Sequence, residues 1–198
     1  MKSKSITIFA LFAIAISSFA FASFNLSWQV DKSHSAINFS VRHFFTPVNG
    51  SFNDYKATIN FNPENLEESN IDVAIQVSSI DTKNDRRNGH LKSADFFEAE
   101  TWPNMTFKSD VIRSTGENEY VATGTLTIKD VSKDFELPFT LLGMGDHPMR
   151  EGSKIAGISA ETVIDRSEFG VGTGDWASDA VVGDKVTVNI LLELNSRN

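Results

Sequence analysis

The sequence predicts an all-β protein folded as an eight-stranded antiparallel barrel. Apolar and polar residues alternate with period two through most of the chain, which is the pattern of strands buried on one face. Eight such segments follow one another through mostly short connections, and no repeating helix separates them. This order favours an up-and-down antiparallel sheet, and closure of that sheet into a barrel removes its exposed edges.

The N-terminus predicts export. An apolar run extends from Ile6 to Phe21 behind two lysines and ends in small residues. At about 16 residues it is shorter than the ~20 residues that span a bilayer. We therefore expect a signal peptide at residues 1–22, cleaved near Ala22, and a single mature domain at residues 23–198.

The composition narrows the compartment and the partners. The chain has no cysteine, so the exported barrel carries no disulfide, and a bacterial periplasm fits best. Removal of Lys2 and Lys4 with the signal peptide lowers the basic count from 18 to 16 against 26 acidic residues, which makes the mature net charge about −10. Such an acidic surface disfavours nucleic acid and anionic lipid head groups as partners. No later segment is apolar for long enough to predict stable membrane insertion.

Turn and break residues separate the predicted strands. A turn at 46–47 ends the first strand, and Gly50 with the polar pair at 53–54 predicts a bulge or bend inside the second. A turn at 129–132 joins the fifth and sixth strands as a hairpin. The eight predicted strands cover residues 37–41, 48–61, 71–77, 105–111, 120–128, 135–141, 155–164 and 186–194.

Two segments break the alternation. Residues 84–97, between the third and fourth strands, predict a short helix with apolar residues on one side. Residues 166–183, between the seventh and eighth strands, are rich in glycine and predict either a flap over one barrel mouth or an ordinary long loop. In the flap, Trp176 would supply an apolar contact and the glycines the hinge.

Strand length predicts a hollow interior. Strands of about ten to twelve residues, tilted by ~40°, give a barrel roughly 25 to 30 Å tall. Such a barrel has more interior than small inward residues such as Ala57, Ala122, Gly124 and Ala160 would fill. We expect an apolar lumen rather than a fully packed core. The predicted lining residues are Ile37, Phe39, Val41, Val73, Ile75, Phe107, Leu126, Phe139, Val188 and Ile190.

Motifs spread along the mature chain resemble those of one known family in their order and approximate spacing. They are WQVD at 28–31, HSAINFSVRH at 34–43, GSF at 50–52, SIDT at 79–82, Arg87, HLKSADFF at 90–97, WPNMTFKS at 102–109, GTLTI at 124–128, RSEFG at 166–170 and VGDKV at 182–186. In these motifs the chain resembles the YceI-like, polyisoprenoid-binding family. The resemblance covers essentially all of the mature sequence.

The resemblance implies a lipocalin-like barrel that holds the tail of a polyisoprenoid in its lumen, such as an isoprenoid quinone like ubiquinone, or a polyprenyl phosphate. It implies a periplasmic binding or transport protein rather than an enzyme, with the lipid as ligand and no cofactor required. The sequence departs from the family pattern at Asn88, where an acidic residue typically follows the arginine. Asparagine keeps hydrogen bonding there but removes the charge.

Four residues are candidates for the polar mouth of the barrel. Arg87 and His90 belong to a basic cluster with Arg86 and Lys92, which would receive a phosphate or a quinone carbonyl, or would form a solvated helix face. His43 stands at a strand end, where it would hydrogen-bond to loop backbone or place a polar group near the ligand head. The predicted mouth residues are His43, Arg87, His90 and Trp176.

The alternative functions come from other classes of protein. A metal- or haem-dependent periplasmic enzyme would use His34, His43 or His90. The sequence has no HExxH motif or comparable ligand spacing, so we expect neither a metal site nor catalytic residues. A stress-linked interaction module is a further alternative. A homodimer and a lipid-handling or electron-transfer partner protein remain open.

Overall fold

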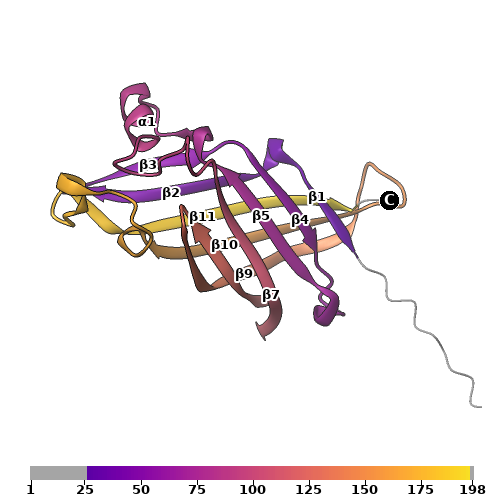
Figure 1. The fold of residues 1–198 in the computed structure, drawn as a ribbon. Helices are drawn as coiled ribbons and strands as arrows, with labels where there is room; N and C mark the ends of the chain where they lie inside the picture. Colours follow the sequence, from indigo (N-terminus) through magenta and orange to yellow (C-terminus); the bar gives the residue numbers. More distant parts are fainter. Residues whose placement is uncertain (1–25, 197–198) are drawn as a thin grey trace, which may run out of the picture.

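The computed structural model describes residues 26–196, so the predicted signal peptide lies outside the described residues. One sheet contains all the strand segments of this part of the chain (Figure 1). The segments are β1 (Ser27–Val30), β2 (Ala36–His43), β3 (Thr46–Phe52), β4 (Tyr55–Asn60), β5 (Asn70–Gln76), β6 (Ile80–Asp81), β7 (Asn104–Gly116), β8 (Glu119–Ile128), β9 (Val131–Asp146), β10 (Lys154–Asp165) and β11 (Val182–Ser196).

Three interrupted strands explain how these segments build an eight-stranded barrel. β1 and β2 pair with successive parts of β11. On their other side, β1 pairs with β4, and β2 pairs with β3. In turn, β4 pairs with β5, and β3 pairs with β6. Each couple therefore acts as one strand with a break. The antiparallel pairing of β1 with β11 closes the barrel. The predicted fold class, an eight-stranded antiparallel barrel, is confirmed.

The three breaks lie side by side. They fall at η1 (Lys32–His34), at residues 53–54 and at η3 (Val77–Ser79). The Asn53 amide donates to the Ser79 carbonyl at 3.3 Å, and Lys32 Nζ lies 3.1 Å from an Asp54 carboxylate oxygen. The bend predicted at residues 53–54 thus belongs to a line of bends that crosses three neighbouring strands.

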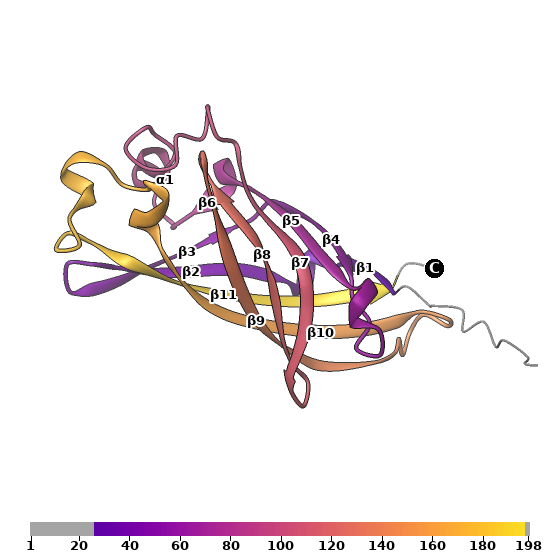
Figure 2. The same cartoon turned by 60° about the horizontal axis from the view of Figure 1, so that its bottom comes forward.

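The irregular segments gather at one end of the barrel (Figures 1 and 2). Helix α1 (Asp85–Leu91) is shorter than the predicted 84–97 helix, because Ser93 Oγ binds the His90 carbonyl at 2.7 Å and turns follow. Asn84 caps its start by accepting from the Arg87 amide at 2.9 Å. Two short 3₁₀ helices, η4 (Arg166–Phe169) and η5 (Gly174–Ala177), form the glycine-rich segment between β10 and β11.

The opposite end of the barrel is filled by aromatic side chains. Phe61, Tyr120 and Phe139 contact one another with ring centroids 5.1 to 5.4 Å apart. Trp28 is fully buried, and its indole nitrogen donates to the Phe61 carbonyl at 2.8 Å. We call these four residues the plug. No helix within residues 26–196 is both long and apolar enough to cross a bilayer.

Small inward residues do not mark the empty space, contrary to the sequence-based argument. Ala122 and Ala160 are buried in the core, and neither lines the cavity described below. Gly124 is also buried, and a Cβ there would collide with the backbone of Lys108 and Ser109. Small side chains at this level make room for close strands and for the neighbouring aromatic rings, so they accompany dense packing.

Candidate functional site

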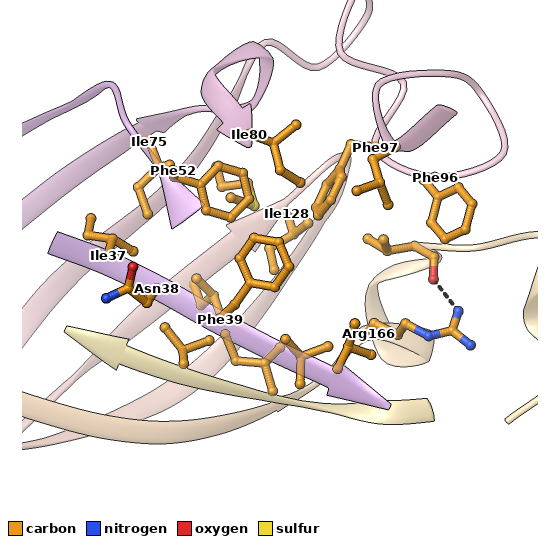
Figure 3. Close-up of a pocket in the computed structure, with 18 of the residues that line it drawn as sticks. Ile37, Asn38, Phe39, Phe52, Ile75, Ile80, Phe96, Phe97, Ile128 and Arg166 are labelled. Atoms are coloured by element: carbon orange, nitrogen blue, oxygen red, sulfur yellow. Dashed lines mark hydrogen bonds between the residues drawn. The ribbon is translucent and has the colours of Figure 1, made fainter. Parts of the chain in front are cut away.

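An apolar cavity occupies the end of the barrel that carries α1. Its empty space is about 900 Å³, a volume that includes solvent at the open mouth. Apart from Asn38 and Arg166, every residue that borders it is apolar (Figure 3). The lining residues are Ile37, Asn38, Phe39, Val41, Phe52, Ile75, Ile80, Leu91, Phe96, Phe97, Met105, Leu126, Ile128, Ile164, Arg166, Val171, Val182, Val186 and Val188.

Three phenylalanine rings shape the cavity wall. Phe52 lies 5.5 Å from Phe39 and 6.1 Å from Phe97, measured between ring centroids, and Figure 3 shows the three rings close together in the cavity. The Phe39 ring covers Gly50 so closely that any Cβ at position 50 would overlap it. Glycine at this position therefore allows the Phe39 ring to pack closely against β3.

The cavity ends part of the way down the barrel. On four strands, one inward residue lines the cavity while the next inward residue toward the plug does not. These pairs are Ile75 and Val73 on β5, Met105 and Phe107 on β7, Leu126 and Gly124 on β8, and Val188 and Ile190 on β11. We call the second members of the pairs the floor. Phe107 also contacts Phe135 at 6.1 Å, which closes the floor above the plug.

The predicted lumen residues divide between the cavity and the core beneath it. All belong to the hydrophobic core or pack against it, except Val41, which borders the cavity alone. Six border the cavity: Ile37, Phe39, Val41, Ile75, Leu126 and Val188. The other four, Val73, Phe107, Phe139 and Ile190, do not border it. Sequence periodicity also extends to Met105, Ile128 and Val186, which border the cavity and were not predicted.

Arg166 is a buried cation at the cavity edge, with only 5% of its surface exposed. Its guanidinium donates to the carbonyls of Val171 at 2.7 Å, Val182 at 2.6 Å and Gly183 at 3.0 Å. An Asp184 carboxylate oxygen lies 3.1 Å from the guanidinium and forms an ion pair with it, although the two groups are not aligned for a hydrogen bond. Arg166 therefore fastens the segment between β10 and β11 over the cavity, and these partners occupy most of its donors.

A cap of three rings lies over the cavity beside Arg166. His90 contacts Phe96 at 5.1 Å and Trp176 at 4.9 Å, and Phe96 borders the cavity. His90 Nε2 lies 3.0 Å from an Asp95 carboxylate oxygen, while the Thr173 amide donates to the Asp95 carbonyl at 2.8 Å. The two predicted mouth residues His90 and Trp176 thus meet in one cluster, which joins the α1 segment to the glycine-rich segment.

The other predicted mouth residues have local partners. Arg87 donates to the Thr82 hydroxyl at 2.8 Å and to the Thr82 carbonyl at 2.7 Å, and it does not border the cavity. Asn88 Oδ1 accepts from Thr82, and its amide donates to Asp81 at 3.1 Å. A carboxylate at position 88 could not donate to Asp81, so asparagine suits this site. His43 contacts Phe44 at the tip of the β2–β3 hairpin.

The three histidines considered as metal ligands have different neighbours. His34 Nδ1 lies 3.1 Å from an Asp31 carboxylate oxygen and 3.6 Å from a Glu193 carboxylate oxygen, whereas His43 contacts Phe44 and His90 lies beside Asp95. The hydrogen bond that the Asp31 carboxylate accepts from the His34 ring raises the pKa of His34 and lowers the pKa of Asp31. Within residues 26–196, Asp31, His34 and Glu193 form the group of side chains whose ligand atoms lie close enough together to share a metal ion. None of the three borders the apolar cavity, and only His34 among them is exposed.

A family model and a curated relative identify one family, and a solved structure shares the fold. Residues 28–194 match the YceI-like domain. Protein YceI of Escherichia coli O6:H1 is 34% identical over 149 residues, which cover 74% of this chain and 76% of that protein. The crystal structure of Burkholderia cenocepacia BcnA superposes with a TM-score of 0.75 at 28% identity, covering 83% of this chain and 99% of BcnA.

A more distant structure shares the fold. A polyisoprenoid binding domain from Saccharophagus degradans, implicated in plant cell wall breakdown, superposes with a TM-score of 0.64 at 14% identity. The alignment covers 87% of this chain and 99% of that domain. At this identity the likeness supports the barrel fold alone.

Proposed function

Because the chain belongs to the YceI-like family, we propose that it binds the apolar tail of a long isoprenoid lipid in the barrel cavity. The observation that carries the proposal is the apolar cavity at one end of the barrel, in which every lining residue except Asn38 and Arg166 is apolar. The floor and the plug close its inner end. A polyisoprenoid binding domain from S. degradans shares this barrel fold.

The size of the cavity sets the scale of binding. The cavity stops at the floor, part of the way down the barrel, so it takes in only part of a long isoprenoid tail. A few hundred Å² of buried apolar surface, at ~25 cal/mol per Å², accounts for micromolar or tighter binding after association costs. No strong polar anchor is needed. Longer tails would extend out of the mouth.

The polar head group sets orientation in this proposal. The floor blocks the inner end, so the tail enters first and the head stays near α1 and the glycine-rich segment. The head would belong to an isoprenoid quinone or a polyprenyl phosphate. Most donors of Arg166, the cation that borders the cavity, are taken by backbone carbonyls, so a head group meets the mouth residues rather than this guanidinium. The protein would act as a periplasmic carrier, without catalysis.

The first test identifies the ligand and its place together. We expect native mass spectrometry of the mature protein, purified without detergent, to show one added mass that organic extraction identifies as a quinone or polyprenyl lipid. Ile75→Glu places a charge on the cavity wall, and we expect it to abolish binding. Ala74→Glu is the matched control, because the neighbouring side chain on β5 points to the other face and should leave binding intact.

Each result has a clear meaning. Loss of binding in Ile75→Glu alone, with an unchanged circular dichroism spectrum, supports binding in the cavity. Equal binding in both variants would reject the cavity as the site. An empty barrel that also takes up no added isoprenoid would reject the proposed function.

A further inference from the structure

The turn between β2 and β3 consists of two phenylalanines, Phe44 and Phe45. Two-residue hairpin loops place their first central residue at positive φ, where glycine, asparagine or aspartate is usual. Phe44 occupies that position with φ of 49°, which bulky side chains rarely adopt. Hairpin formation alone does not favour this sequence, so the aromatic pair calls for a functional reason.

Both side chains face water. Phe44 is 49% exposed and Phe45 is 98% exposed, in a chain that buries most of its large apolar side chains. Backbone and charge contacts fix the turn that presents them. The Phe44 amide donates to the Val181 carbonyl at 2.9 Å, and Arg42 donates to the Phe44 carbonyl at 2.7 Å. The tip is therefore a fixed apolar projection.

The hairpin tip stands at the mouth end of the barrel. His43, the residue before the turn, pairs with Val182, and both Val182 and Val41 border the cavity. Figures 1 and 2 show the β2–β3 turn beside the glycine-rich segment at the end that carries α1. A surface that contacts this tip would therefore lie close to the opening through which a lipid tail enters.

We propose that Phe44 and Phe45 dock the cavity mouth on a phospholipid bilayer. Two phenylalanine side chains offer at most ~400 Å² of surface, whereas a specific protein interface takes about 800 Å² per partner. Shallow insertion of an apolar projection among lipid head groups needs no such area. The nearest cation, Arg42, is paired with Asp179 at 2.9 Å, so no unpaired charge of that arginine opposes contact with acyl chains.

Charge makes the kind of membrane contact specific. The chain carries a formal net charge of −8, so anionic head groups repel it. Docking therefore works through the two apolar side chains and requires neither anionic lipid nor low salt. This docking rests on the proposed function. Its purpose would be to let an isoprenoid pass between the bilayer and the cavity without crossing water.

The test compares two routes of loading. Vesicles of phosphatidylcholine containing a polyprenol supply the lipid from a membrane, and a cyclodextrin complex supplies the same polyprenol from water. We expect Phe44→Gly with Phe45→Ser to slow uptake from vesicles by about tenfold or more, because the apolar contact is lost. Uptake from cyclodextrin should not change. The glycine suits the positive φ, so thermal stability should be equal or higher.

A matched control comes from the other end of the barrel. Met149, in the β9–β10 turn, is 86% exposed and lies away from the mouth, so Met149→Ser should leave both rates unchanged. Unchanged vesicle uptake in the hairpin variant would overturn the docking proposal. So would a wild-type dimer, formed without lipid, that the hairpin variant loses, because the tip would then contact a second copy. Failure of the wild type to load from either source would reject the proposed function instead.

Discussion

The two ends of the barrel are stabilised in different ways. At the closed end, the rings of Phe61, Tyr120 and Phe139 contact one another, and the buried Trp28 donates to the Phe61 carbonyl. At the mouth end, the inward side chains border a cavity, and polar contacts fasten the covering segments. Arg166 alone donates to three backbone carbonyls there.

This difference shows how one β-barrel combines stability with a binding space. Apolar side chains around a cavity lack contacts on one side, so they contribute less dispersion energy than side chains in a packed core. A dense plug at one end supplies the stability that the hollow end lacks. Charged and backbone groups then position the loops of the hollow end without filling it. The same phenylalanine-to-alanine change should therefore have unequal effects at the two ends.

The largest expected effect lies in the plug. We expect Phe61→Ala to lower the free energy of unfolding by about 3 to 5 kcal/mol, because it leaves a hole among packed rings. Phe97→Ala, in a ring that already borders empty space, should cost about 1 to 2 kcal/mol. Guanidinium unfolding of the two ligand-free variants measures both values. Equal losses would mean that the cavity wall is packed as tightly as the plug.

The next effect tests the polar fastening of the mouth. Arg166→Met keeps a long side chain but leaves the carbonyls of Val171, Val182 and Gly183 without their donor. We expect a loss of about 3 kcal/mol and faster amide exchange in residues 166–183, with little change in the plug. Arg166→Lys should recover less than half, since one ammonium does not reproduce the guanidinium fork. Protection that falls equally throughout the barrel would contradict a local role.

The sequence predicts the face of each strand well and the depth of each residue poorly. Period two places Ile75 and Val73 on the same inward face, yet Ile75 borders the cavity and Val73 belongs to the floor. Nothing in the alternation distinguishes them, because depth depends on strand tilt and on which side chains meet from other strands. The same limit separates Leu126, which borders the cavity, from Phe139, which joins the plug.

Polar and irregular positions were harder to predict. Arg166 lies in a segment that the glycines mark as a loop, and its burial depends on carbonyls that the fold brings from Val182 and Gly183. The cap of His90, Phe96 and Trp176 joins two segments about 80 residues apart, which local patterns do not connect. The alternation of apolar and polar residues and the family resemblance each predicted the architecture, while the side-chain contacts required the structure.

The smallest expected effect concerns two carboxylates, Asp165 at the mouth end of β10 and Asp146 at the closed end of β9. At the mouth end, hydrogen bonds from Ser167 and Lys185 lower the pKa of Asp165 to about 2. A lowered pKa means that the ionised carboxylate stabilises the fold above pH 4, and that this stability is lost as the pH falls from about 4 toward 2. Because Asp165 is partly exposed, we expect Asp165→Asn to lower the free energy of unfolding by only about 1 kcal/mol at pH 7. This difference from the wild type should shrink as the pH falls from about 4 toward 2.

Asp146→Asn is the control from the closed end of the barrel, where the carboxylate pairs with Lys154 at 3.2 Å but is 93% exposed. An exposed pair of this kind contributes little, so its loss should change the free energy of unfolding by less than about 0.5 kcal/mol at any pH. Urea unfolding of the three proteins between pH 7 and pH 3 measures both effects. Asp165 has the stronger contacts of the two carboxylates. If both variants lost the same free energy of unfolding at every pH, polar contacts would therefore stabilise the mouth end no more than the closed end.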